Sequence, residues 1–181
     1  MPDKADLKGM MYGLVTALGG ETRIPEGAHA VTDFDMQRYL GRWYEIARLD
    51  HSFERELTHV TATYELREDG DIEVINRGFS TTEQKWDEAR GRARFETDDH
   101  RLGRLRVTFF GPFYAGYNVL WVDEHYQHAV VAGPTHDYLW LLARTPQPAE
   151  RAYHAMLEQA RANGFDVARL LRVGHDSDAT E

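Results

Sequence analysis

The chain has 181 residues, of which 42% are hydrophobic and 28% charged, so it can bury the core of one domain and is short for two. Its 30 acidic and 21 basic residues give a net charge of −9, which disfavours nucleic acid as a partner. It contains no cysteine, which excludes disulfides, thiolate nucleophiles, cysteine-bound metals and lipid attached to a cysteine.

Residues 1–33 are predicted to be an arm outside the folded domain. Residues 10–20 form an apolar stretch preceded by two lysines, as in a secretory signal, but two aspartates balance those lysines and Gly13 interrupts the stretch. Two interpretations stay open, a degenerate signal segment and a short amphipathic arm. Residues 21–33 show no hydrophobic period and are predicted to be a linker, and residues 174–181 a disordered acidic tail. The folded domain is therefore predicted over residues 34–173.

The domain begins with a predicted one-turn helix over residues 34–40, and after it the dominant hydrophobic period is two. Apolar and polar residues alternate most clearly over residues 60–67 and 104–109. Further strands are predicted over residues 42–49, 72–78, 85–97, 117–123, 128–133 and 138–144. Short turns rich in Gly, Asp and Pro separate most of these segments. Eight sequential strands predict an all-β, up-and-down antiparallel barrel, with a sandwich as the alternative.

One longer helix is predicted after the strands, over residues 148–163. Pro148 suits its first turn and Gly164 the position just past its end. One face of this helix is apolar and carries Ala152, Tyr153, Met156, Leu157 and Ala160. We expect this face to pack on the outside of the barrel. Residues 165–173 form a last strand-like stretch.

Motifs at the two ends of the strand series resemble the lipocalin family. Gly41-Arg42-Trp43-Tyr44 opens the first strand, and Arg144 ends the eighth. Residues 39–48, 60–64, 109–114, 116–119 and 137–140 are similar to the bacterial lipocalins, which are relatives of apolipoprotein D. The resemblance covers residues 31–173. It implies an eight-stranded lipocalin barrel in which Arg144 lies over Trp43 in a cation–π contact that closes one end, so that Gly41, Trp43, Tyr44 and Arg144 are structural.

The same resemblance implies a location in the cell envelope, either the periplasm or the outer membrane. Bacterial lipocalins usually begin with a signal peptide that ends in a lipidated cysteine, whereas this chain has Thr16-Ala17-Leu18-Gly19 in the corresponding region. Acylation at that position is therefore excluded. The sequence itself also permits a cytoplasmic protein.

A binding site is predicted at the end of the barrel opposite Gly41. Because successive hairpins alternate ends, residues 50–58, 79–84, 111–116 and 134–137 all lie at this mouth. Clustered at one end, its aromatic residues suit an aliphatic chain, although any single one of them is more simply explained as an ordinary loop anchor. The candidate ligand contacts are Tyr114 and Trp140 first, then Phe53, Phe79, Phe113 and Tyr138, with Asn118 and His136 as hydrogen-bonding partners of a headgroup.

The resemblance implies that a fatty acid or lysophospholipid binds reversibly in the barrel, chain inward, for storage or transport, with a role in membrane maintenance. It also implies a homodimer, and it calls for no cofactor or metal. The enzyme alternative is a lipocalin-fold enzyme that acts on a lipid-like substrate near His136 and Asp137. Neither Gly-x-Ser-x-Gly nor His-Glu-x-x-His is present, and His125 with His128 is best explained as a chance pair in a turn.

Arginines of one parity on two neighbouring predicted strands form a further candidate surface. These are Arg90, Arg92, Arg94, Arg104 and Arg106. The simplest interpretation is a solvated outer face of the barrel. Transient contact with an anionic membrane surface is the alternative, and the net charge of −9 makes any such contact local and sensitive to salt.

Overall fold

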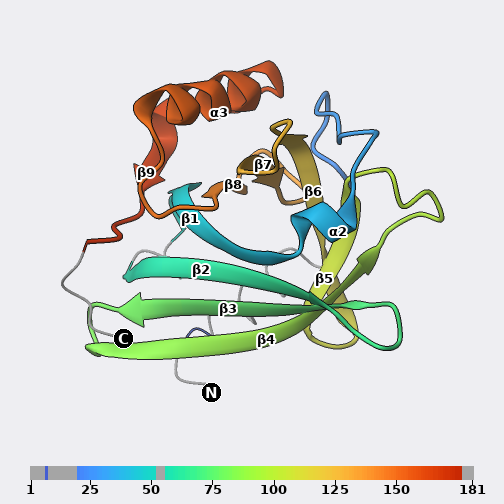
Figure 1. Cartoon of the computed structure of the whole chain (residues 1–181), viewed down its shortest axis with the longest axis horizontal. Coiled ribbons are helices and arrows are strands. Elements are labelled where there is room, and N and C mark those ends of the chain that lie inside the picture. Colours follow the sequence, from blue (N-terminus) through green and yellow to red (C-terminus); the bar gives the residue numbers. More distant parts are fainter. Residues whose placement is uncertain (1–6, 8–19, 52–55, 177–181) are drawn as a thin grey trace.

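The computed structural model describes residues 7, 20–51 and 56–176, which form an antiparallel sheet closed into a barrel (Figure 1). Its strands are β1 (Gly41–Leu49), β2 (Leu57–Leu66), β3 (Ile72–Ser80), β4 (Lys85–Phe95), β5 (Arg104–Phe110), β6 (Phe113–Val122), β7 (His128–Ala132), β8 (Leu139–Ala143) and β9 (Leu170–Arg172). Strands β2 to β8 follow one another around the sheet in chain order, and β1 closes it by pairing with both β2 and β8. The predicted eight-stranded up-and-down barrel is therefore confirmed, and the sandwich alternative is wrong.

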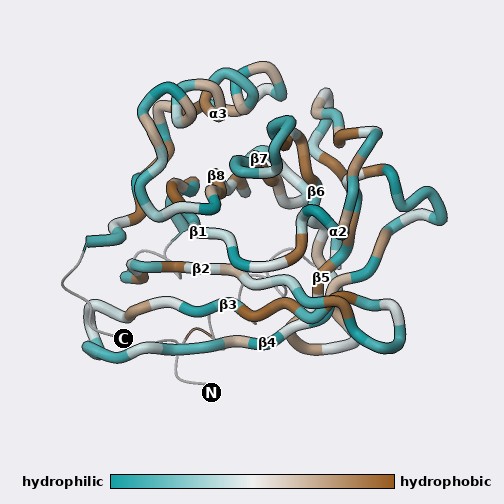
Figure 2. Tube along the Cα trace, viewed as in Figure 1, coloured by the Kyte–Doolittle hydropathy of each residue, from teal (hydrophilic) through white to brown (hydrophobic). Residues whose placement is uncertain are grey.

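Alternation along the strands decides which side chains face the interior. In the pairing of β3 with β4, Ile72 lies opposite Ala93 and Val74 opposite Gly91, and this set points inward. The alternate residues on β4, Arg90, Arg92 and Arg94, point outward. Figure 2 shows the contrast, with the start of β3 in hydrophobic colours and much of β4 in hydrophilic ones. A period of two thus gives β3 and β4 one wet and one dry face, whereas β7 and β8 are buried on both faces.

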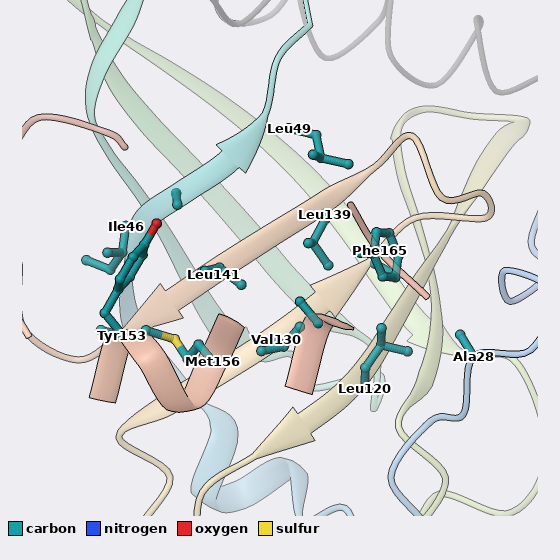
Figure 3. Packing of buried hydrophobic residues seen from close by; sticks show 14 residues of the cluster. Ala28, Ile46, Leu49, Leu120, Val130, Leu139, Leu141, Tyr153, Met156 and Phe165 are labelled. Carbon is teal, nitrogen blue, oxygen red and sulfur yellow. The ribbon is translucent and has the colours of Figure 1, made fainter. Parts of the chain in front are cut away.

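Helix α3 (Glu150–Ala162) packs on the outside of the barrel, as predicted (Figure 1). Its buried residues Tyr153, Met156 and Ala160 belong to one cluster with outward-facing residues of the strands (Figure 3). From β1, β6, β7 and β8 these include Ile46, Leu49, Leu120, Val130, Leu139 and Leu141. The helix ends where Gly164 takes a φ of +86° and the Phe165 N–H donates to the carbonyl of Ala160 at 3.1 Å.

Two shorter helical turns flank the barrel strands. Helix α2 (Met36–Tyr39) confirms the predicted turn before β1, and the Asp35 carboxylate caps it by accepting from the N–H groups of Gln37 and Arg38. A 3₁₀ turn, η1 (Val167–Arg169), leads into β9. Among the described residues, no helix is long and apolar enough to span a membrane.

The segment before the barrel is bound to its outer surface. The Gly116 N–H donates to Glu21 O at 2.9 Å, the Val31 N–H to Val119 O at 2.9 Å, and the Gly103 N–H to Val31 O at 2.8 Å. Residues 21–33 lack a hydrophobic period because they lie as irregular chain against β6 and the turn before β5. The prediction of a linker is therefore wrong for this segment.

Residues 174–176, predicted to belong to a disordered tail, instead join β1 to β2. The Val173 N–H donates to Ile46 O, and the His59 N–H donates to Gly174 O at 2.8 Å. The ring of His175 reaches the Glu45 carbonyl at 2.7 Å. The chain beyond β9 thus bonds to both strands near the predicted mouth.

Candidate functional site

The end of the barrel where β1 begins is closed by one arginine. The Arg144 guanidinium lies 3.8 Å from the centroid of the fully buried Trp43 ring, which is the contact that the sequence motifs implied. Arg144 also donates to the backbone carbonyls of Arg38, Tyr39, Leu40, Arg42 and Tyr126. Gly41 has a φ of +94°, and a Cβ there would lie 3.4 Å from Nη1 of Arg144. Glycine therefore suits this position both in conformation and in space.

Above this closed end, three phenols join across the barrel interior. The Tyr117 hydroxyl lies 2.6 Å from that of Tyr39 and 2.7 Å from that of Tyr64. Burial raises the pKa of all three phenols well above the usual value, so they stay neutral and can share their O–H hydrogens. Together with Trp43 they form a floor whose polar atoms are satisfied.

The half of the interior near the mouth is lined mostly by apolar side chains. Leu57 and Val60 of β2, Ala89 of β4 and Ala115 of β6 are buried in one cluster, which we call the mouth cluster. Phe109, Tyr138 and Trp140 pack against it. Side chains are small at inward positions of β3, β4 and β6, where Gly78, Ala89, Gly91 and Ala115 stand.

Trp140 points into the barrel. In the pairing of β8 it lies opposite Val131, which faces the interior, whereas Leu139 and Leu141 on either side pack under α3. The sequence left this parity open, because all three residues are apolar. The strand register therefore places one of the two leading candidates where a ligand in the barrel would contact it.

Tyr114, the other leading candidate, lies on the outer surface. Its neighbour Ala115 is in the mouth cluster, so strand alternation turns Tyr114 outward. Its ring centroid is 5.7 Å from the Arg94 guanidinium and 5.2 Å from that of Arg106. The prediction that Tyr114 lines the cavity is wrong. Its ring instead contacts Arg94 and Arg106 on the outer face of the barrel.

Both candidate headgroup partners have structural contacts outside the barrel. Asn118 is fully buried and donates to Arg23 O and Gly133 O, so that it holds the amino-terminal arm against the barrel. The His136 ring lies 3.1 Å from Asn163 O and 4.8 Å from the Phe165 ring, at the end of α3. These contacts correct the prediction that Asn118 and His136 reach a headgroup. They also remove His136 from the position that the enzyme alternative gave it.

The remaining aromatic candidates are divided among several environments. Phe79 points outward, because its neighbours Gly78 and Ser80 face inward. Its ring lies edge-on to that of Trp86, with 5.6 Å between the ring centroids. Phe113 is 49% exposed at the β5–β6 turn. Tyr138 stacks on His51 at 4.3 Å beside the mouth cluster. Phe53 lies outside the described residues. Of the predicted aromatic contacts, Trp140 and Tyr138 are the two that the structure brings together at the mouth cluster.

The arginines of β4 are ion-paired on the outer face, and Arg104 of β5 donates to the carbonyl of Thr22 at 3.3 Å. Arg92 lies 3.1 Å from a carboxylate oxygen of Asp69, and Arg94 lies 2.7 Å from one of Asp71. Arg90 likewise pairs with Glu88 at 2.8 Å. These contacts agree with a solvated polar face. His128 pairs with Asp123 at 2.8 Å, and within residues 7, 20–51 and 56–176 no three potential metal ligands gather.

The structure places two groups of residues in the barrel interior that the sequence analysis did not predict. Leu7, 1% exposed, belongs to the mouth cluster although it precedes the barrel by more than thirty residues. Glu45 and Arg48 are 8% and 5% exposed and form an ion pair of 2.9 Å. Burial raises the pKa of the Glu45 carboxyl, although the Arg48 charge opposes that effect. The even spacing of a regular strand would not place both of these side chains on one face, so hydrophobic periodicity could not predict the pair.

A closed eight-stranded barrel with one sealed end and a largely apolar interior defines a protein that can enclose one small molecule. The Lipocalin-like domain family matches residues 34–175, and the chain belongs to the lipocalin family. It is 50% identical over 160 residues to the outer membrane lipoprotein Blc of Citrobacter freundii, covering 88% of this chain and 89% of the relative. It is 30% identical over 146 residues to apolipoprotein D of Mus musculus, covering 76% and 75%.

Solved structures support the fold independently. Insecticyanin from the tobacco hornworm Manduca sexta superposes with a TM-score of 0.70 at 17% identity, covering 87% of this chain and 89% of that one. The cockroach allergen Per a 4 superposes with a TM-score of 0.68 at 18% identity, covering 84% and 95%. At such low identity the likeness concerns the barrel alone.

Proposed function

We propose that the chain binds one amphiphilic lipid, a fatty acid or a lysophospholipid, inside its barrel, and that it stores or transports this lipid. The observation that carries the proposal is the inward ring of Trp140 beside the apolar mouth cluster. The opposite end is sealed by Arg144 on Trp43, so the ligand enters from the mouth with its chain leading.

The energetics favour a long apolar chain over a small polar molecule. Burying about 12 methylene groups at about 0.8 kcal/mol each contributes roughly 10 kcal/mol. Association and ordering oppose this by a few kcal/mol, which leaves a dissociation constant of about micromolar. A chain in this half of the barrel has to take the place of Leu7, whose side chain belongs to the mouth cluster.

We further infer that this lipid is handled in the cell envelope, with a role in membrane maintenance. Relatives that are 48 to 50% identical carry the name outer membrane lipoprotein, which supports this location. Both the location and the choice of lipid are part of the proposal.

Extraction of bound molecules tests the proposal directly. The purified full-length chain is extracted with organic solvent, and the extract is analysed by mass spectrometry against an extract of buffer alone. We expect an unaltered fatty acid or lysophospholipid at close to one per chain. An empty protein that also takes up none of these lipids when they are added would refute the proposal, and a product that accumulates from added lipid would favour the enzyme alternative.

A further inference from the structure

A cation lies inside the barrel beside the proposed lipid site. The Arg48 guanidinium donates through Nη1 to the Glu45 carboxylate at 2.9 Å and through Nη2 to Leu57 O at 3.0 Å. Across β8, Arg48 lies opposite Trp140 and Glu45 lies opposite Leu142, two residues that pack in the interior. The Arg48 charge therefore lies on the strand next to that of Trp140, whose indole ring we expect to contact a lipid chain.

An irregularity in β1 turns this cation inward. Between Glu45 and Ala47 the register with β8 shifts, so Glu45 and Arg48 both face the interior although they are three residues apart. Ile46, Ala47 and Leu49 pack in the cluster under α3 instead. Without the shift, strict alternation would place Arg48 and Glu45 on opposite faces of the sheet.

Stability alone is a weak reason for such a pair. Removing two charges from water opposes the gain from their attraction, and well-packed apolar residues often replace buried ion pairs without loss of stability. A guanidinium offers planar, paired N–H donors that match carboxylate and phosphate oxygens, and it makes stronger hydrogen bonds when the acceptor is charged. Its position near the mouth end of β1 is also where the headgroup of a lipid would come to rest if the chain enters first.

We propose that Arg48 recognises the anionic headgroup of the bound lipid, a carboxylate or a phosphate, and that Glu45 orients the guanidinium when the site is empty. On binding, the headgroup shares the guanidinium with Glu45 or replaces it as partner. This inference rests on the proposed lipid-binding function and adds a preference for anionic over neutral lipids of equal chain length.

Matched ligand pairs test the inference. Palmitic acid is compared with hexadecanol, and palmitoyl lysophosphatidic acid with monopalmitoylglycerol, by calorimetry on the full chain. We expect the intact protein to prefer the anionic member of at least one pair by about tenfold or more. In Arg48→Met this preference falls to near unity, and the pair that loses it identifies the preferred anion.

Two further variants control for misfolding and for the loss of a positive charge elsewhere on the barrel. The double variant Arg48→Met with Glu45→Gln leaves no buried charge without its partner, so it should fold and should lack the preference in the same way. Arg90→Met removes an equal charge from the outer face of β4 and should retain the full preference. Retention of the preference in the folded double variant would overturn the assignment of Arg48.

The outcome also separates this inference from the proposed function. If affinity rises with chain length in the intact protein but neither anionic lipid binds better than its neutral partner, the role of Arg48 is wrong and lipid binding stands. If no ligand shows a dependence on chain length, the barrel-interior site itself is wrong.

Discussion

Replacing Trp140 with alanine tests the inward orientation on which the lipid site depends. The strand register turns this ring toward the mouth cluster, whereas Tyr114, the other aromatic candidate from the sequence, lies outside against Arg94 and Arg106. The two residues therefore form a matched pair. Each substitution removes one large aromatic ring near the mouth, but only that of Trp140 removes a contact with a chain inside the barrel.

The expected size of the effect follows from the apolar area that one ring covers. Loss of the contact between the Trp140 indole and a lipid chain should weaken binding by about 1–3 kcal/mol, or roughly 5- to 150-fold. Tyr114→Ala should change the dissociation constant by less than about twofold, since surface changes away from a site are usually within about 0.5 kcal/mol.

Calorimetry with palmitic acid measures both variants, and circular dichroism verifies that each is folded. Trp140 also packs against interior residues, so Trp140→Leu serves as a second variant that retains part of the apolar volume. Equal weakening in Tyr114→Ala and Trp140→Ala would refute the assignment of the inner and outer faces. Unchanged affinity in a folded Trp140→Ala would remove the ring from the site.

Three other perturbations test separate parts of the molecule. Trp43→Ala should lower the free energy of unfolding by about 3–5 kcal/mol in a urea titration, because it removes a fully buried ring, and a variant as stable as the parent would contradict the sealed end. Leu7→Asp should tighten lipid binding by about tenfold, because the ligand no longer displaces a buried leucine, whereas Leu171→Asp at an exposed site should leave affinity unchanged. Equal or weaker binding by the Leu7 variant would show that this side chain does not compete with the ligand. Burial lowers the pKa of the His175 imidazole, so the folded chain binds fewer protons at this residue than the unfolded chain does. The stability that results is present above the unfolded pKa of about 6.5 and is lost as the pH falls. Urea titrations at neutral and acidic pH should therefore show a smaller loss in His175→Gln than in the parent, and identical losses would contradict this.

The sequence predicted the strands well because apolar and polar residues alternate along several of them and turn residues separate the others. It also predicted the end of α3, since Gly164 supplies the positive φ that terminates the helix. Connection order alone indicated which loops share the mouth. These features depend on local spacing and on topology, both of which can be derived from residue order.

Which face each aromatic residue occupies was much harder to predict. The pairing shifts between Glu45 and Ala47 on β1, between Thr58 and Thr61 on β2, and between Val107 and Phe110 on β5. Each shift changes the parity of the residues beyond it, and these irregularities lie in the strands that lead to the mouth. The errors for Tyr114 and Phe79 belong to this region, where proximity to the mouth was mistaken for orientation into it. Contacts that no period encodes, such as those of Leu7, were also missed.

The central claim, that the barrel interior holds an aliphatic chain, is tested most directly by calorimetry with saturated fatty acids of increasing length. Each added methylene group that becomes buried should contribute about 0.8 kcal/mol, which is about a fourfold gain in affinity, until the barrel is filled and the gain stops. Affinity that is the same for short and long chains would contradict the barrel-interior site.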